Sequence, residues 1–177
     1  MIVDVEKVIA VALADVGRGE ATGRNDGPWI EAILGEPTPP SGVGQPWCAA
    51  AVMRWYERAG YPFARLGREP AWMVPFWACR AVATLFAELT ERGCRVGEGD
   101  RIEPGDLCVM LGAGAANAGA TGHVELVTAV ERSPDAVVVR CVGGNVGNAV
   151  RRTQRRAFAS EVSGYVRPRR LIEAHTP

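Results

Sequence analysis

Apolar residues recur at helical spacing in the first half of the chain and alternate with other residues in the second half. The helical spacing predicts four helices, which cover residues 3–16, 29–34, 46–59 and 75–92. The later pattern predicts five strands, at residues 107–111, 123–130, 136–142, 150–153 and 163–167. Helices that precede strands are typical of an α+β domain with a mainly antiparallel sheet. We therefore expect N-terminal helices packed on a sheet of about five strands.

Length and charge narrow the possible functions. The 177 residues fit one domain, residues 1–177, which is long enough to bury a substantial core. Twenty basic residues balance twenty acidic ones, so no overall field favours nucleic acid or an anionic membrane. Arginines do gather at residues 151–156 and 167–170, where we expect solvated surface. We predict no nucleic-acid partner and a monomer.

The N-terminal segment and the hydropathy pattern indicate where in the cell we expect the protein. The first turn carries acids and lacks the basic segment that opens a secretory signal, and no apolar run approaches the length of a membrane span. We expect a protein that is cytoplasmic as synthesised and does not insert into membranes. Release from the cell would then need lysis or a dedicated secretion or phage machine.

The chain has five cysteines, an odd number that includes no CxxC pair and no zinc-like spacing with histidine. This argues against a disulfide framework and a structural metal site. We predict no metal and no cofactor. Four of the cysteines are expected to be buried packing residues, namely Cys79, Cys94, Cys108 and Cys141.

Cys48 differs from the other four because of its position. It follows Pro46 and Trp47 at the predicted start of a helix, after a loop rich in proline and glycine. Unpaired backbone N–H groups and the helix dipole stabilise a thiolate at such a position. We interpret Cys48 as a candidate nucleophile.

A thiol nucleophile needs a base, and His123 is the candidate. It begins a strand after a glycine-rich loop, and Glu125 and Val127 share its strand face by alternation. The other histidine, His175, lies near the C-terminus, where we expect disorder.

The group that orients the base is left open between alternatives. Asn145, after the next strand, is the preferred third member, although a turn asparagine is an equally good reading of its local sequence. Glu20 and Asp106 are rival carboxylates, and Asp106 has the position of a turn-capping residue. Gln45 is a possible oxyanion donor, and Trp47 and Glu20 are candidate substrate contacts.

Several short motifs occur together in one order. They are Pro46-Trp47-Cys48-Ala49-Ala50-Ala51-Val52, Pro104-Gly105-Asp106-Leu107, Gly122-His123-Val124, Gly143-Gly144-Asn145 and Gly164-Tyr165-Val166-Arg167-Pro168. This order resembles CHAP domains, the cysteine, histidine-dependent amidohydrolase/peptidases related in fold to NlpC-type enzymes. The earlier segments Gly19-Glu20 and Asn25-Asp26-Gly27 are similar to a bacterial and phage branch of that family.

The resemblance implies a papain-like fold with Cys48 as nucleophile, His123 as general base and Asn145 as the polar third member. It further implies cleavage of amide bonds in peptidoglycan, as an amidase or an endopeptidase, through a thioester. One position departs from the pattern: some CHAP enzymes have a glutamate two residues before the asparagine, where this chain has Gly143. Glu20 is the alternative source of that carboxylate.

Two other readings stay open. The chain could be a non-catalytic papain-like module that binds a glycan or a protein, although such a module has no need of a Cys/His pair. It could also be a cysteine amidohydrolase that acts on a protein amide. The sequence does not separate a prophage lysin, a tail-associated hydrolase and a secreted antibacterial effector.

Overall fold

The structure is a computed structural model that describes residues 1–34, 44–65, 70–75, 81–112 and 122–176. Its helices are α1 (Val5–Ala14), α2 (Pro28–Leu34), α3 (Cys48–Arg58), α4 (Val82–Glu91) and α5 (Pro168–His175). Its strands are β1 (Ala64–Arg65), β2 (Val74–Pro75), β3 (Leu107–Leu111), β4 (Gly122–Arg132), β5 (Val137–Val146), β6 (Ala149–Arg156) and β7 (Gly164–Val166).

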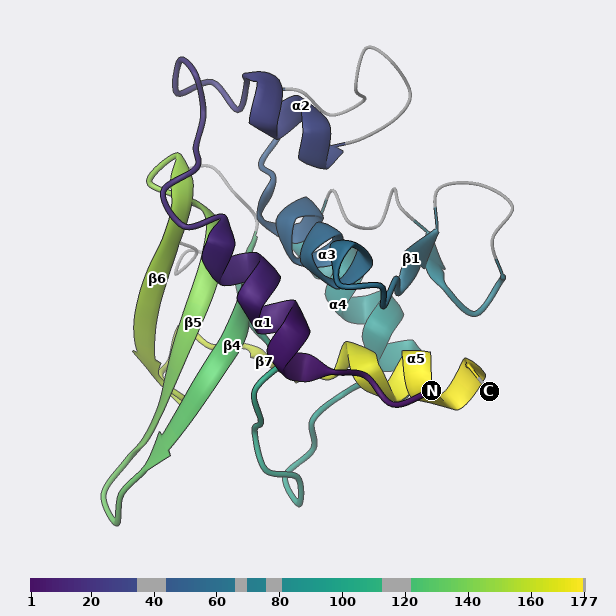
Figure 1. Ribbon diagram of the computed structural model, residues 1–177. Coiled ribbons are helices and arrows are strands. Elements are labelled where there is room, and N and C mark those ends of the chain that lie inside the picture. Colours follow the sequence, from purple (N-terminus) through teal and green to yellow (C-terminus); the bar gives the residue numbers. More distant parts are fainter. Residues whose placement is uncertain (35–43, 66–69, 76–80, 113–121, 177) are drawn as a thin grey trace.

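The larger sheet has five strands in the order β6-β5-β4-β3-β7, and every neighbouring pair is antiparallel. The predicted α+β class with a mainly antiparallel sheet is confirmed. β1 and β2 form a separate parallel pair. Helices α1 and α3 lie together on one side of the large sheet (Figure 1).

Strand alternation divides the buried side chains between the two faces of the large sheet. Val109, Val124 and Leu126 pack on the helix side in the main core. Cys108 and Val127, their neighbours along β3 and β4, belong to a second cluster on the other face. By alternation, His123 and Glu125 of β4, which belong to the site described below, lie on the same strand face as Val127.

The start of α3 differs slightly from its prediction. Pro46 was expected in the first helical turn, but the helix begins at Cys48, with Trp47 as its N-cap at φ −117° and ψ 9°. The Trp47 side chain makes no capping hydrogen bond to this helix. Gly60, at φ +91°, ends the helix as the sequence predicted.

The fourth helix is shorter than predicted. Its expected range, 75–92, begins at Pro75, but Pro75 and the preceding Val74 form β2, which pairs with Ala64–Arg65. Helix α4 begins at Val82, and its buried face consists of Val82, Leu85 and Leu89.

The expected disorder around His175 is wrong. Residues Pro168–His175 form α5, with Pro168 in the first turn and Leu171 and Ile172 buried. The His175 ring stacks on Trp72 with ring centroids 5.0 Å apart. The end of α5 lies beside the N-terminus (Figure 1), where the Met1 amino group donates to the Thr176 carbonyl. Packing therefore orders a segment whose position in the chain alone suggested fraying.

Asp106 has a structural role, as its turn position indicated. The buried Arg167 guanidinium donates to both of its carboxylate oxygens, over 2.7 and 3.0 Å. Asp106 also accepts from the backbone N–H of Glu103. This pair ties the turn before β3 to the junction of β7 and α5, so Asp106 is committed to the fold.

Within the described parts of the chain, no helix is long and apolar enough to cross a membrane.

Candidate active site

Cys48 is the first residue of α3, and its side chain is buried. The first N–H groups of an α-helix have no acceptor within the helix, and they point toward its N-terminus. The thiol therefore lies at the positive end of the helix dipole. Helix α3 packs on β4 and β5, which brings this end toward the strand that carries the histidine.

His123 is the second residue of β4 and pairs with Met110 of β3. Its ring is buried, and its Nε2 atom lies 3.2 Å from Glu125 Oε1. The Nδ1 atom has no hydrogen bond of standard geometry with any residue that the structure describes. The ring is thus held at one nitrogen, and the other is available for proton transfer.

Glu125 supplies a carboxylate at the imidazole, which the sequence analysis had sought from Glu20. It is fully buried on the same strand face as His123, two residues farther along β4. Arg155 on β6 donates to it twice, Nε to Oε2 over 2.9 Å and Nη2 to Oε1 over 2.7 Å. Thr153 Oγ1 donates to Oε2 over 2.7 Å. Three neighbours therefore stabilise this buried negative charge.

These contacts explain the charge state of Glu125. Burial alone raises the pKa of its carboxyl group, but the bonds from His123 and Arg155 outweigh that effect and lower the pKa to about 2. Glu125 is ionised across the whole range in which an imidazole titrates. It can therefore stabilise His123 in its protonated form.

Gly143 provides the space that the Glu125 side chain occupies. Gly143 lies opposite Glu125 in the β4–β5 ladder. A Cβ atom at position 143 would lie 2.9 Å from Glu125 Cγ and 3.0 Å from Oε1. The departure from the family pattern at Gly143 thus coincides with a carboxylate supplied by the neighbouring strand.

Cys48 and Glu125 both affect the charge of His123. Burial lowers the pKa of the imidazole, whereas interactions with Cys48 and Glu125 raise it to about 9. The Cys48 thiol therefore neighbours the ring, although Nδ1 and the sulfur do not meet the geometry of a formed hydrogen bond. The sulfur is close to the ring but not hydrogen-bonded to it.

The raised pKa of His123 predicts a pH-dependent stability. The folded protein holds the imidazolium more strongly than the unfolded chain does, so this stabilisation is full below pH 6.5 and is lost as the pH rises through about 9. We expect the free energy of unfolding to fall by about 3 kcal/mol over that range. Urea unfolding at several pH values checks this. The His123→Gln protein should lack the slope and the His175→Gln protein should keep it, and parallel curves for wild type and His123→Gln would contradict it.

Asn145 lies at the end of β5 and is buried. The β4–β5 ladder ends at Glu125 and Gly143, two residues before Asn145. Its Nδ2 atom donates to Asn25 Oδ1 over 3.0 Å. The catalytic role of Asn145 stays a prediction, and the hydrogen bond seen here joins it to another loop.

The predicted substrate contacts have different surroundings. Gln45 is exposed just before α3, where an oxyanion donor could reach a bound carbonyl. Trp47 is fully buried, with its ring 5.2 Å from that of Trp29, and its indole N–H donates to Glu20. The structure thus joins Trp47 and Glu20 to each other, and the substrate-binding role predicted for them stays a prediction.

Glu125, Thr153 and Arg155 are the site residues that the sequence reasoning missed. The sequence did contain a signal for Glu125. An acidic residue that alternates with apolar residues, on a strand predicted to be buried, needs a partner for its charge. The signal for Arg155 was hidden in the run of arginines at 151–156, which was interpreted as solvated surface. Alternation along β6 puts Thr153 and Arg155 on the same face of the strand.

The remaining cysteines fit the packing role expected of them where the structure describes them. Cys94, Cys108 and Cys141 are buried and free. Cys79 lies outside the described residues. Among those residues, no group of three or more histidine, cysteine or acidic side chains could hold a metal ion.

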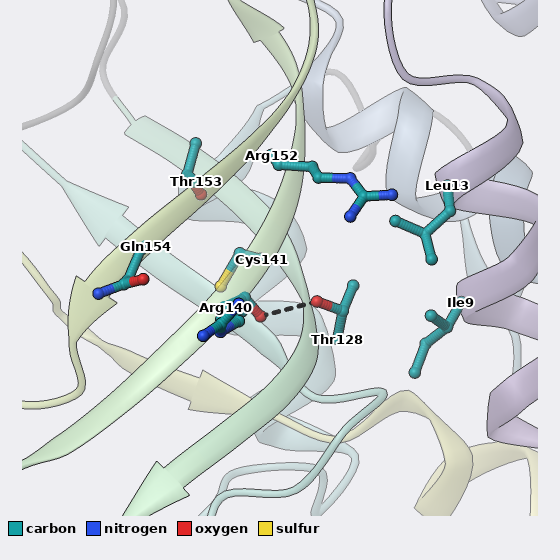
Figure 2. Close-up of a pocket in the computed structure, with 8 residues that line it drawn as sticks. All are labelled: Ile9, Leu13, Thr128, Arg140, Cys141, Arg152, Thr153 and Gln154. Carbon is teal, nitrogen blue, oxygen red and sulfur yellow. Dashed lines mark hydrogen bonds between the residues drawn. The ribbon is translucent and has the colours of Figure 1, made fainter.

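A cavity of about 410 Å³ lies elsewhere, between α1 and the strands β4, β5 and β6. Figure 2 shows the Arg152 side chain reaching across it toward Leu13. None of the residues assigned to the candidate site except Thr153 lines it. Cys48, His123 and Glu125 are not among its lining residues, so it does not mark the place of the thiol chemistry.

Comparison of the chain with protein-family models, with curated proteins and with solved structures gives no match. The site is therefore interpreted from its own geometry.

Proposed function

We propose that this protein is a cysteine hydrolase of papain-like fold that cleaves amide bonds. The proposal rests on the imidazole of His123. Glu125 holds its Nε2 atom, its Nδ1 atom is available for proton transfer, and the interaction with Cys48 raises its pKa. A thiol at a helix N-terminus beside an oriented imidazole is the arrangement that nucleophilic catalysis by cysteine requires. A purely binding module has no need of it.

The reaction follows from this arrangement. His123 Nδ1 takes the proton of the Cys48 thiol, or already holds it as an imidazolium paired with the thiolate, and the sulfur attacks the carbonyl carbon of the amide to form a tetrahedral intermediate. The intermediate collapses with cleavage of the C–N bond, and His123 returns the proton to the leaving amine. Water, deprotonated by His123, then attacks the thioester, which releases the carboxylic acid and restores the thiol.

Negative charge develops on the carbonyl oxygen in both tetrahedral intermediates. The backbone N–H of Cys48, at the first position of α3, is a donor that the helix itself does not use. The exposed side chain of Gln45 is a second donor within the same loop. We assign the oxyanion site to these two groups.

Peptidoglycan is the proposed substrate class. The support is the ordered set of motifs shared with CHAP domains, which includes the segments around Cys48, His123 and Asn145. The amide cut would join sugar to stem peptide or lie within the peptide and its cross-bridges. A protein amide is the alternative substrate.

Digestion of purified peptidoglycan tests both the activity and the bond. We expect the protein to release soluble fragments, and mass spectrometry of these fragments identifies the new amine and the new carboxyl group. At mildly acidic pH, iodoacetamide should modify one cysteine quickly, and peptide mapping should assign the modification to Cys48. Intact peptidoglycan together with an inert Cys48 thiol would refute the proposed hydrolase.

A further inference from the structure

A short loop before α2 is joined to both the nucleophile segment and the end of β5. Among the residues that the structure describes, three other than glycine have positive φ: Asn25 at 56°, Asn145 at 59° and Asn148 at 64°. All three lie in or against this loop. Such backbone conformations are costly for residues with a side chain and persist only where surrounding contacts hold them.

Glu20 is the anionic centre of this loop. Its Oε1 atom accepts the indole N–H of Trp47 over 2.9 Å, and its Oε2 atom accepts the backbone N–H of Asn25 over 2.9 Å. Each carboxylate oxygen therefore holds a different segment. An amide in place of the carboxylate offers only one acceptor oxygen, so it cannot satisfy both donors.

Asn25 continues the connection in two directions. Its backbone carbonyl accepts from the N–H of Gly44 over 2.9 Å, and its Nδ2 atom donates to the Gly44 carbonyl over 3.4 Å. Its Oδ1 atom accepts from Asn145 over 3.0 Å. The segment that leads into Cys48 is thereby tied to the end of the strand beside His123.

Backbone hydrogen bonds fasten the other end of the loop to the turn between β5 and β6. Glu20 N–H donates to the Asn148 carbonyl over 3.0 Å, and Gly17 N–H donates to the Val150 carbonyl over 3.0 Å. At Gly19, a Cβ atom would lie 2.6 Å from the Asn148 carbonyl oxygen, so the approach requires glycine. Glu20 therefore projects from a backbone that the sheet already fixes.

Trp47, the residue next to the nucleophile, has little freedom on its other sides. A Cβ atom on Gly144 would lie 2.7 Å from Trp47 Cζ3, and the Trp29 ring packs edge-on against it. The bond to Glu20 fixes the remaining rotation of this buried indole. Because Trp47 is the N-cap of α3, its position determines where the helix starts and where the Cys48 sulfur lies.

We propose that Glu20 is a positioning residue: through Trp47 and Asn25 it holds the N-terminus of α3 so that the Cys48 thiol faces Nδ1 of His123. Its effect on turnover rests on the proposed hydrolase function. Its effect on the thiol does not, because the reactivity of Cys48 can be measured without a substrate.

Glu20→Gln tests this, with Glu31→Gln as the matched control, because Glu31 is an exposed residue of α2. In Glu20→Gln we expect the rate of Cys48 alkylation by iodoacetamide at pH 6 to fall by roughly tenfold to a hundredfold, because small displacements of reacting groups have effects of that size. The kcat for peptidoglycan should fall by a similar factor with KM little changed. Glu31→Gln should alter neither.

Two further variants keep the test decisive if Glu20→Gln folds poorly. Trp47→Phe keeps a ring in the packed position but removes the indole donor, and Asn25→Gly keeps the positive φ but removes both side-chain bonds. Each should slow alkylation, and Trp47→Phe combined with Glu20→Gln should slow it less than the product of the single effects. Wild-type alkylation rates in the folded variants would overturn the proposal. Failure of the wild type to digest peptidoglycan, with these alkylation effects intact, would refute the proposed substrate and leave the positioning role of Glu20 in place.

Discussion

The Cys48→Ala protein should lose hydrolysis of peptidoglycan by a factor on the order of 10⁴ or more, because removal of a nucleophile leaves only the contribution of binding and the oxyanion site. The side chain is almost fully buried at the first position of α3, and alanine is well accepted in helices. We expect a loss of about 1 kcal/mol in the free energy of unfolding. Release of soluble fragments and circular dichroism measure the two effects separately.

The same substitution should change His123. The interaction with Cys48 helps to raise the pKa of the imidazole to about 9. Without the sulfur we expect a lower pKa, read from the Cε1 proton by NMR. With only two histidines in the chain, the His175→Gln protein assigns the signal.

Cys94→Ala is the matched control for Cys48→Ala. Cys94 is free and fully buried, and burial raises the pKa of its thiol, as for an inert packing residue. We expect full hydrolysis and a modest loss of stability. Cys108 and Cys141 are less suitable, because both interact electrostatically with Glu125. Retained turnover in Cys48→Ala would exclude the proposed nucleophile.

Local pattern predicted most of the fold. Strand β3 lies at its predicted residues 107–111, because a short apolar run after a Pro-Gly turn favours one buried strand. The helix that carries Cys48 was predicted from the spacing of Val52, Trp55 and Tyr56, which are all buried. The local sequence pattern was sufficient to predict a helix or strand where the spacing of its own apolar residues determined its position in the chain.

The site required information that a local pattern does not contain. Alternation placed Glu125 on the face of His123, but only the pairing of β5 with β6 brings Arg155 to the same carboxylate. Glycine at position 143 was interpreted as a missing carboxylate, whereas it is space for one from the adjacent strand. The register between neighbouring strands decided both points, and the periodicity of a single strand does not specify that register.

Glu125→Gln is the second large effect that we expect. The substitution keeps the shape of the side chain but removes its charge, so the imidazolium of His123 loses its nearest anion. We expect kcat to fall by roughly 10² to 10⁴, the range seen when the group that orients a catalytic histidine is neutralised. The pKa of His123 should fall from about 9, and the pH profile of kcat should shift with it.

Glu125→Gln should also destabilise the fold, since Arg155 then points its guanidinium at a neutral partner. A loss of about 3 kcal/mol is expected for breaking a buried ion pair. Kinetics should therefore be measured at a temperature where circular dichroism shows the variant folded. Thr153→Val, which removes one hydrogen bond but keeps the charge, should reduce kcat by less than about tenfold.

Glu131→Gln is the matched control on the same strand. Glu131 pairs with Arg140 at the exposed part of β4, so its neutralisation should leave kcat and the pKa of His123 unchanged.

Asn145→Ala tests the opposing hypothesis, in which Asn145 is the third catalytic member, as the resemblance to CHAP domains implies. If Asn145→Ala lowers kcat far more than Glu125→Gln does, and Glu125→Gln leaves the His123 titration in place, then the asparagine orients the base and the carboxylate only fills the space beside Gly143.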